Sequence, residues 1–263
     1  MHRFCGRRNR ALFVLGGALL FVITAQAGAQ RPSASPDAAA VGSYLQLGKP
    51  IFCGGGNAPY VAFTFDDGPG LLTSQLVTLL RSTGVPGTFF LIGRKVIHMP
   101  GVVRQEMKLG VLGDHTWDHP QLLTLENDPR GVETELSSTK VAISKRTGLQ
   151  VSLFRAPFGQ QDATIDGIAQ GLGLLDIEWS VAVDDIATED VMYQALVDHV
   201  QAGSIVLMHE NQPGEIEALA RFLPVLHDRG LTAVTVPQLL ALDPPDRSDL
   251  PNWAGQCEAH WHS

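Results

Sequence analysis

Residues 60–69 read YVAFTFDDGP, in which a run rich in apolar, aromatic and β-branched side chains is followed by two carboxylates and a Gly-Pro pair. Such a run, bounded by turn residues, is typical of a buried strand. Adjacent carboxylates repel one another unless a cation or a base takes up the charge. Asp-Gly is also a common turn dipeptide. Asp66 and Asp67 are therefore either chemical groups at a strand end or part of a solvated turn.

Beyond this strand, the chain alternates between short β-rich runs and longer helical runs. Strands are expected at 60–65, 88–92, 111–113, 151–154, 174–179, 204–208 and 231–234, with helices at 72–83, 101–109, 128–146, 162–170, 189–200, 215–229 and 237–242. This pattern of about seven β-α units predicts a parallel sheet with helices outside it. It favours a barrel or near-barrel over an open sheet.

Side chains suited to acid–base chemistry or metal binding follow five of these strands directly. They are Asp66 and Asp67 after the first strand, His115 and His119 after the third, Arg155 after the fourth, Asp184 and Asp185 after the fifth, and His209 after the sixth. In β/α barrels the C-terminal ends of the strands carry the active site. The sequence therefore predicts that these residues meet in one site.

Two of the histidines lie four residues apart in HTWDH, residues 115–119. In a helical turn or a tight loop both imidazoles can reach one ion. A strand-end carboxylate would complete a site of two histidines and one carboxylate with open coordination positions. Taken alone, Arg155 would equally suit a surface ion pair, and His209 a buried core histidine.

These segments resemble the NodB-homology polysaccharide deacetylases, also called carbohydrate esterase family 4. The resemblance covers most of residues 60–242 and is carried by TFDDGP (64–69), GTFF (87–90), HTWDH (115–119), RAPF (155–158), WSV (179–181) leading to Asp185, and LMH (207–209). It implies a distorted (β/α)7 barrel. It also implies a hydrolase that removes N-acetyl groups from N-acetylglucosamine-containing polysaccharide (peptidoglycan, chitin oligomers or exopolysaccharide) and releases acetate.

The resemblance further implies a role for each residue at the first motifs. Asp66 would be the catalytic base, and Arg155 would pair with it and orient it. Asp67, His115 and His119 would bind a divalent metal, which is usually zinc in this family.

The later motifs would supply the remaining groups. His209 would be the general acid, oriented by Asp185, although the choice between Asp184 and Asp185 stays open. The backbone N–H of Phe158 would help to hold the oxyanion, and Leu207 would line the pocket for the acetyl methyl group. Phe158 stands where the family usually has Tyr, so a hydroxyl is lost while the backbone donor remains.

Residues 1–29 have the layout of a signal peptide: four arginines, then an apolar run over 11–24, then small residues at 25–29. An uncleaved anchor is the alternative interpretation. We expect a secreted or periplasmic protein with no stable membrane association after cleavage. The expected organisation continues with a linker or N-terminal extension over 30–57, the deacetylase domain over 58–243 and a C-terminal tail over 244–263.

The composition limits the partners. The 263 residues suit one barrel-sized domain. Removal of residues 1–29 leaves 15 basic and 27 acidic residues, a formal charge of −12. That balance argues against nucleic acid and anionic membranes as partners, and it neither favours nor disfavours binding of a neutral glycan. Cys53 and Cys257 remain after cleavage, and export of a chain with two cysteines predicts a disulfide between them.

Three other functions fit parts of the same pattern. An O-acetyl esterase acting on xylan would use the same fold, metal and base. A non-haem iron oxygenase can use two histidines and one carboxylate, although such sites usually lie on antiparallel β-scaffolds. An inactive glycan-binding module would need none of Asp66, Arg155 and His209.

Overall fold

Eight parallel strands form the sheet in the part of the chain that the computed structural model describes, which is residues 1–2, 36–125, 128–183, 188–248 and 250. The order is β5-β4-β3-β2-β1-β7-β6, and β8 pairs with β1. The strands are β1 Tyr60–Gly68, β2 Gly87–Leu91, β3 Gly110–Asp114, β4 Leu153–Phe154, β5 Leu175–Asp176, β6 Val181–Ala182, β7 Ile205–His209 and β8 Thr232–Val234. The predicted parallel sheet is confirmed, and β1 lies within it, between β2 and β7.

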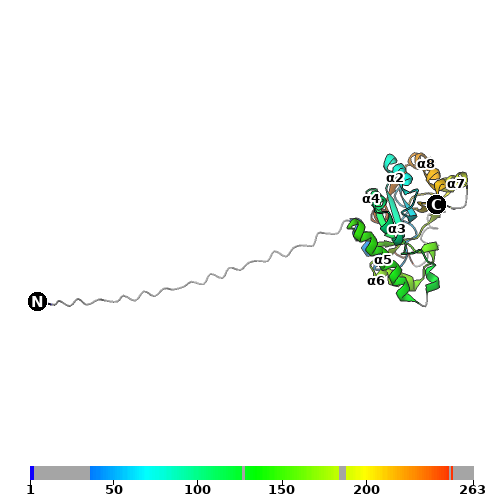
Figure 1. Ribbon diagram of the computed structural model, residues 1–263. Coiled ribbons are helices and arrows are strands. Elements are labelled where there is room, and N and C mark those ends of the chain that lie inside the picture. The colour runs from blue at the N-terminus through cyan, green and yellow to red at the C-terminus, as the bar shows by residue number, and fades with distance from the viewer. Residues whose placement is uncertain (3–35, 126–127, 184–187, 249, 251–263) are drawn as a thin grey trace. The chain divides into compact units, whose positions relative to one another are not determined.

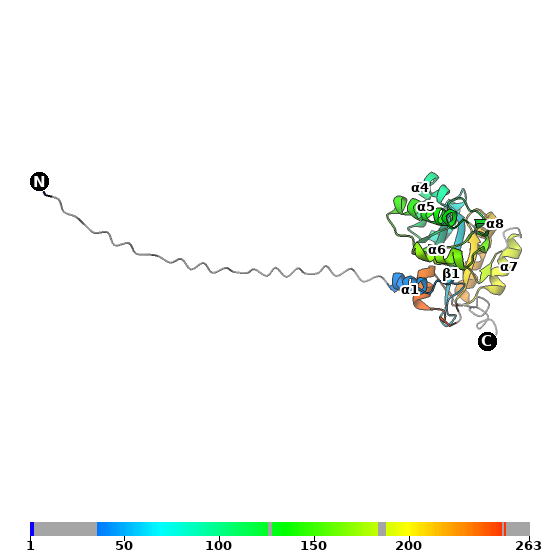
Figure 2. The same ribbon diagram turned by 90° about the horizontal axis from the view of Figure 1, so that it is seen from below.

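The helices lie outside the strands (Figures 1 and 2). They are α1 Pro36–Leu45, α2 Thr73–Thr83, α3 Gly93–His98, α4 Pro100–Glu106, α5 Pro129–Thr147, α6 Ala163–Gly171, α7 Glu189–His199, α8 Pro213–Asp228 and α9 Val236–Leu242, with 3-10 turns η1 Leu122–Leu125 and η2 Pro157–Gly159. Side chains cap the first turns of two helices: the Asp128 side chain accepts from Gly131 N, and the Thr188 side chain accepts from Val191 N. None of the described helices is long and apolar enough to cross a membrane.

The predicted strand at 174–179 is divided, and the division closes the sheet into a distorted barrel. Ile177 N donates to Phe154 O, on β4, whereas Ser180 N donates to Ile205 O, on β7. The chain therefore leaves one end of the strand order and reaches the other within a few residues. This crossing splits the expected strand into β5 and β6.

The expected linker over 30–57 contains a helix that packs against the domain. Val41 and Tyr44 of α1 are buried, and the Tyr44 hydroxyl donates to Pro245 O at 2.9 Å. Figure 2 shows α1 at the edge of the domain, where it packs on α9. Ile51 then forms a parallel bridge with Ile177. The part of this segment that the structure describes thus packs against the domain and is not a linker.

Two expectations fall on residues that the structure does not describe. The signal peptide over 1–29 is one of them. The Cys53–Cys257 disulfide is the other, because Cys257 lies outside the described residues, while Cys53 is buried beside Ser204. Both stay predictions.

Candidate active site

Asp66 and Asp67 lie at the C-terminal end of β1 and have different partners. Asp67 has a φ of 67°, in the left-handed region that non-glycine residues rarely adopt. The backbone turns there, so the two carboxylates point to different targets. Asp66 Oδ1 accepts from Arg155 Nη1 at 2.8 Å. Asp67 Oδ1 lies 3.3 Å from His119 Nε2 and 3.8 Å from His115 Nε2.

The loop after β3 holds the two histidines in one fixed arrangement. Thr116 and His119 also have positive φ angles, of 65° and 60°. Hydrogen bonds stabilise these conformations: Thr116 N donates to Asp114 Oδ1 at 2.9 Å, and His119 N donates to Thr116 Oγ1 at 3.0 Å. The Glu135 carboxylate accepts from two further backbone N–H groups of the loop. Strained backbone held in this way is common at functional sites.

Asp67, His115 and His119 fit a divalent metal. Each offers one ligand atom, and these atoms all lie within 4.8 Å of one another. Asp67 Oδ1 is buried and has no hydrogen-bond donor among the described residues, so a cation would satisfy it. His115 Nδ1 lies 2.9 Å from Arg155 O, which accepts the Nδ1 proton and leaves Nε2 free to bind a metal. Burial and the neighbouring His115 lower the pKa of His119, which favours the neutral form that metals require.

Arg155 is fully buried beneath Asp66, so a surface ion pair is excluded. Its Nη1 donates to Asp66 and, at 2.7 Å, to Thr64 Oγ1. Its Nε and Nη2 donate to the carbonyls of Ile177 and Glu178. These contacts fix the guanidinium, which in turn fixes one oxygen of Asp66. The other oxygen, Oδ2, lies 3.6 Å from His115 Nε2 and therefore faces the candidate metal ligands.

His209 ends β7 directly beside Asp66, its partner in the strand register. Its Nδ1 lies 2.9 Å from Glu215 Oε1, and its backbone N–H donates to Glu215 Oε2. Glu215 is buried in the first turn of α8. Burial of the ring opposes its charge, but the hydrogen bond and charge of Glu215, with smaller contributions from Asp66 and Asp67, raise the pKa of His209 to about 9.

Sequence analysis missed Glu215. The one available signal is an acid at the start of a helix that follows the strand ending at His209, and an acid in the first turn is common in helices of any function. Asp184 and Asp185 lie outside the described residues, so the orienting role of Asp185 stays a prediction.

Phe158 and Leu207 lie next to the groups described above. Phe158 has a φ of 62° and is 59% exposed, and its ring packs edge-on against His119 with the centroids 4.6 Å apart. Leu207 lies two residues before His209 on β7, so both side chains project from the same face of the strand. Their roles toward the oxyanion and the acetyl methyl group stay predictions.

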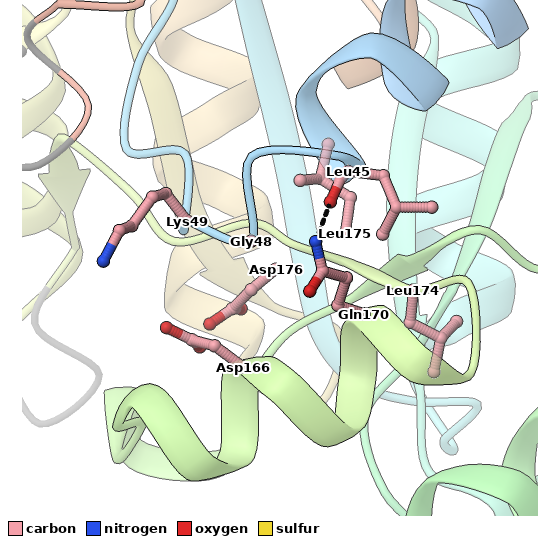
Figure 3. A pocket seen from close by; sticks show the side chains of 8 residues that line it. All are labelled: Leu45, Gly48, Lys49, Asp166, Gln170, Leu174, Leu175 and Asp176. Atoms are coloured by element: carbon pink, nitrogen blue, oxygen red, sulfur yellow. Dashed lines mark hydrogen bonds between the residues drawn. The ribbon is translucent and has the colours of Figure 1, made fainter.

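A second group of acids lies against β5 and α6 (Figure 3). The carboxyl groups of Asp166 and Asp176 face each other beside Lys49. Burial raises the pKa of Asp166 to about 6, and burial together with the charges of Glu178 and Asp166 raises the pKa of Asp176 well above its usual range. Neither residue belongs to the metal-binding group.

Comparison with curated proteins finds deacetylases. The chain is 31% identical over 202 residues to a chitooligosaccharide deacetylase of Sinorhizobium fredii, covering 70% of this chain and 93% of that protein. It is 32% identical over 183 residues to the peptidoglycan-N-acetylglucosamine deacetylase PgdA of Listeria monocytogenes, covering 68% of this chain. The match spans only 38% of the length of that Listeria protein.

Solved structures give the same result. The Bc1960 peptidoglycan N-acetylglucosamine deacetylase superposes with a TM-score of 0.70 at 26% identity, covering 75% of this chain and 95% of that chain. BA3943, a family 4 pseudoenzyme from Bacillus anthracis, superposes with a TM-score of 0.69 at 27% identity, covering 73% of this chain and 68% of that chain. The sequence model for polysaccharide deacetylase matches residues 54–176, which contain β1 and the metal-binding group. The chain therefore belongs to the polysaccharide deacetylase family, carbohydrate esterase family 4.

Proposed function

We propose that this chain is a metal-dependent hydrolase that removes N-acetyl groups from N-acetylglucosamine-containing polysaccharide and releases acetate. One observation carries the proposal: Asp66, the metal-binding group and His209 meet at one end of the sheet, with Asp66 and His209 paired in register. A base, a metal site and an acid side by side are the parts that amide hydrolysis needs. Relatives named as deacetylases of peptidoglycan and chitooligosaccharide support this substrate class.

Asp67, His115 and His119 would hold the metal, which we propose to be zinc. When bound, such a metal polarises a carbonyl oxygen and lowers the pKa of a coordinated water. His115 is oriented for this role because its Nδ1 is held by the carbonyl of Arg155.

Asp66 would take the proton of the attacking water. Arg155 holds Oδ1, so Oδ2 is the oxygen left facing the metal-binding residues, where that water would lie. The buried guanidinium is held in this geometry because its other donors are occupied by protein acceptors. The Phe158 N–H would support the oxyanion, and Leu207 would contact the acetyl methyl group.

His209 would protonate the departing amine nitrogen. An amine leaves poorly until it is protonated, whereas an alkoxide leaves more readily, so a charged histidine favours amide over ester substrates. The carboxylate that holds Nδ1 leaves Nε2 to donate this proton.

Acetate release from purified, metal-loaded protein tests the proposal against chito-oligosaccharides, peptidoglycan and acetylated xylan. We expect release from the amide substrates. Activity on xylan alone would show an O-acetyl esterase. Binding of the glycans without any release would show an inactive module, as the name of the Bacillus anthracis relative describes for that protein.

We further propose that residues 1–29 direct export to the periplasm or the medium, and that Cys53 pairs with Cys257 in the exported protein. Sequencing the N-terminus of protein recovered outside the cytoplasm tests cleavage near residue 29. Thiol titration of the denatured, unreduced protein tests the pairing, and two free thiols per mature chain would rule it out.

A further inference from the structure

The Glu215 carboxylate has both oxygens engaged by one residue, although the motifs of the sequence give it no role. Oε1 faces the His209 ring at 2.9 Å, and Oε2 accepts from the His209 backbone N–H. The Glu215 side chain is fully buried, while the His209 side chain is 20% exposed. In an ordinary surface ion pair the acid would be exposed, and its two oxygens would not both be held by one residue.

The two contacts determine which ring nitrogen is presented to the site. A carboxylate only accepts hydrogen bonds, so Nδ1 carries a proton when it faces Oε1. Nε2 is then the nitrogen left toward the end of β1, where Asp66 lies in register. The backbone contact also ties the last residue of β7 to the first turn of α8, so the ring and the strand end move together.

Among the described residues, the nearby charges that act most on the ring favour its protonated form. Glu215 acts from α8, and Asp66 and Asp67 act from β1. Burial alone would lower the pKa of His209, and these acids raise it instead to about 9. Asp184 and Asp185 lie outside the described residues.

We propose that Glu215 is the positioning residue that keeps His209 protonated and turns its Nε2 toward the substrate. This inference rests on the proposed function. It assigns the orienting role to Glu215 on helix α8, six residues after His209, in place of Asp185, which follows the WSV motif. The residue also explains how the chain could keep an effective general acid above neutral pH.

Glu215→Gln is the test, because the amide keeps the size and one of the two acceptor oxygens but removes the charge, and its NH2 group cannot accept the second N–H of His209. If the pKa of His209 falls back to about 6.5, kcat on an amide substrate drops on the order of ten-fold or more at pH 8 and changes little at pH 6. KM and metal content should stay the same. Activity on an activated ester should fall far less, because its leaving group needs no proton. Glu217→Gln, an exposed acid on the same helix, is the matched control and should behave as wild type.

A second measurement separates this inference from the proposed function. NMR titration of the His209 ring, assigned with His209→Gln, needs no substrate and should give a midpoint well above 6.5 in the wild type and a lower one in Glu215→Gln. Both proteins are loaded with the same metal, so the charge of the metal acts on both. A wild-type midpoint at or below 6.5 would overturn the role of Glu215. So would a plot of kcat against pH whose decline at alkaline pH shifts in Asp185→Asn and not in Glu215→Gln. The expected NMR shift without acetate release from any substrate would instead refute the deacetylase activity.

Discussion

Two clusters at this site contain the same kinds of side chain and differ in their electrostatics. In one, Asp67 lies within reach of His115 and His119, and the pKa of His119 is lowered by burial and by the second imidazole. In the other, Glu215 contacts one site histidine, His209, and the pKa of His209 is raised to about 9. Burial and the second imidazole outweigh the carboxylates at His119, whereas Glu215 outweighs burial at His209, so the two clusters favour opposite protonation states.

The backbone shows the same division. Asp67, Thr116 and His119 all have positive φ angles, so the first cluster depends on three unfavourable conformations. His209 and Glu215 belong to a regular strand and a regular helix. Asp67 Oδ1 is left without a donor among the described residues, whereas both oxygens of Glu215 are engaged. The strained cluster therefore suits a cation, and the regular one suits a proton.

The largest effect should come from the carboxylate between the two clusters. Asp66→Asn should reduce acetate release by about a hundred- to ten-thousand-fold, the usual cost of losing a general base. Metal content should stay at the wild-type level, since Arg155 and not the metal group holds its Oδ1. Elemental analysis of the same sample checks this. Metal loss in Asp66→Asn with retention in Asp67→Asn would reverse the assignment of the pair.

Asp67→Asn should weaken metal binding by the cluster of Asp67, His115 and His119, and added metal should partly reverse the effect. A neutral amide oxygen is a poorer ligand than a carboxylate, so metal content should fall and excess metal should partly restore activity. His115→Ala and His119→Ala should lose metal in the same manner. Metal titrations with acetate release as readout give the apparent affinities. No dependence on added metal in any of the three would remove these residues from the metal site.

His209→Ala removes the imidazole of the His209–Glu215 cluster and should affect amide substrates more than ester substrates. Deacetylation of an amide substrate should fall by roughly a hundred-fold, because the amine nitrogen leaves unprotonated. Hydrolysis of an activated ester should fall far less, and metal content should not change. Parallel kcat measurements on both substrates decide this. Equal losses would exclude His209 as the general acid.

Much of the site could be predicted because parallel strands place their C-terminal ends at one edge. Asp66, His115, Arg155 and His209 each follow an apolar run, so their proximity follows from the strand pattern alone. Glu215 could not be found in this way, since its role depends on where α8 begins and how its first turn lies against β7. The split of the strand at 174–179 was hidden for a similar reason, because its hydrogen-bond partners, Phe154 and Ile205, are distant in sequence.

The smallest effect concerns a pair in which a carboxylate faces a carboxylate instead of an imidazole. Asp166 and Asp176 lie opposite one another beside Lys49 (Figure 3), and both have raised pKa values, chiefly because of burial. A carboxyl group whose pKa is higher in the folded than in the unfolded chain binds protons better when folded. Its contribution to stability is fully present below its pKa in the unfolded chain, which is about 4. That contribution is lost as the pH rises through its pKa in the folded chain.

Asp176→Asn should therefore stabilise the protein at neutral pH and not in acid. The amide carries no charge at any pH, so the variant escapes the loss of stability that the wild type undergoes as the pH rises above the unfolded pKa of about 4. We expect a rise of a few degrees in Tm at pH 7.5, because burial disfavours the charged form of Asp176, and little change at pH 4.5. Thermal unfolding of the metal-loaded protein at both values measures the difference, with Asp198→Asn, an exposed aspartate of α7 bonded to Gln194, as the control. An equal change at both pH values would mean that Asp176 acts through packing. Burial and neighbouring charge would then not set the protonation of this carboxylate pair as they do for the two histidine clusters.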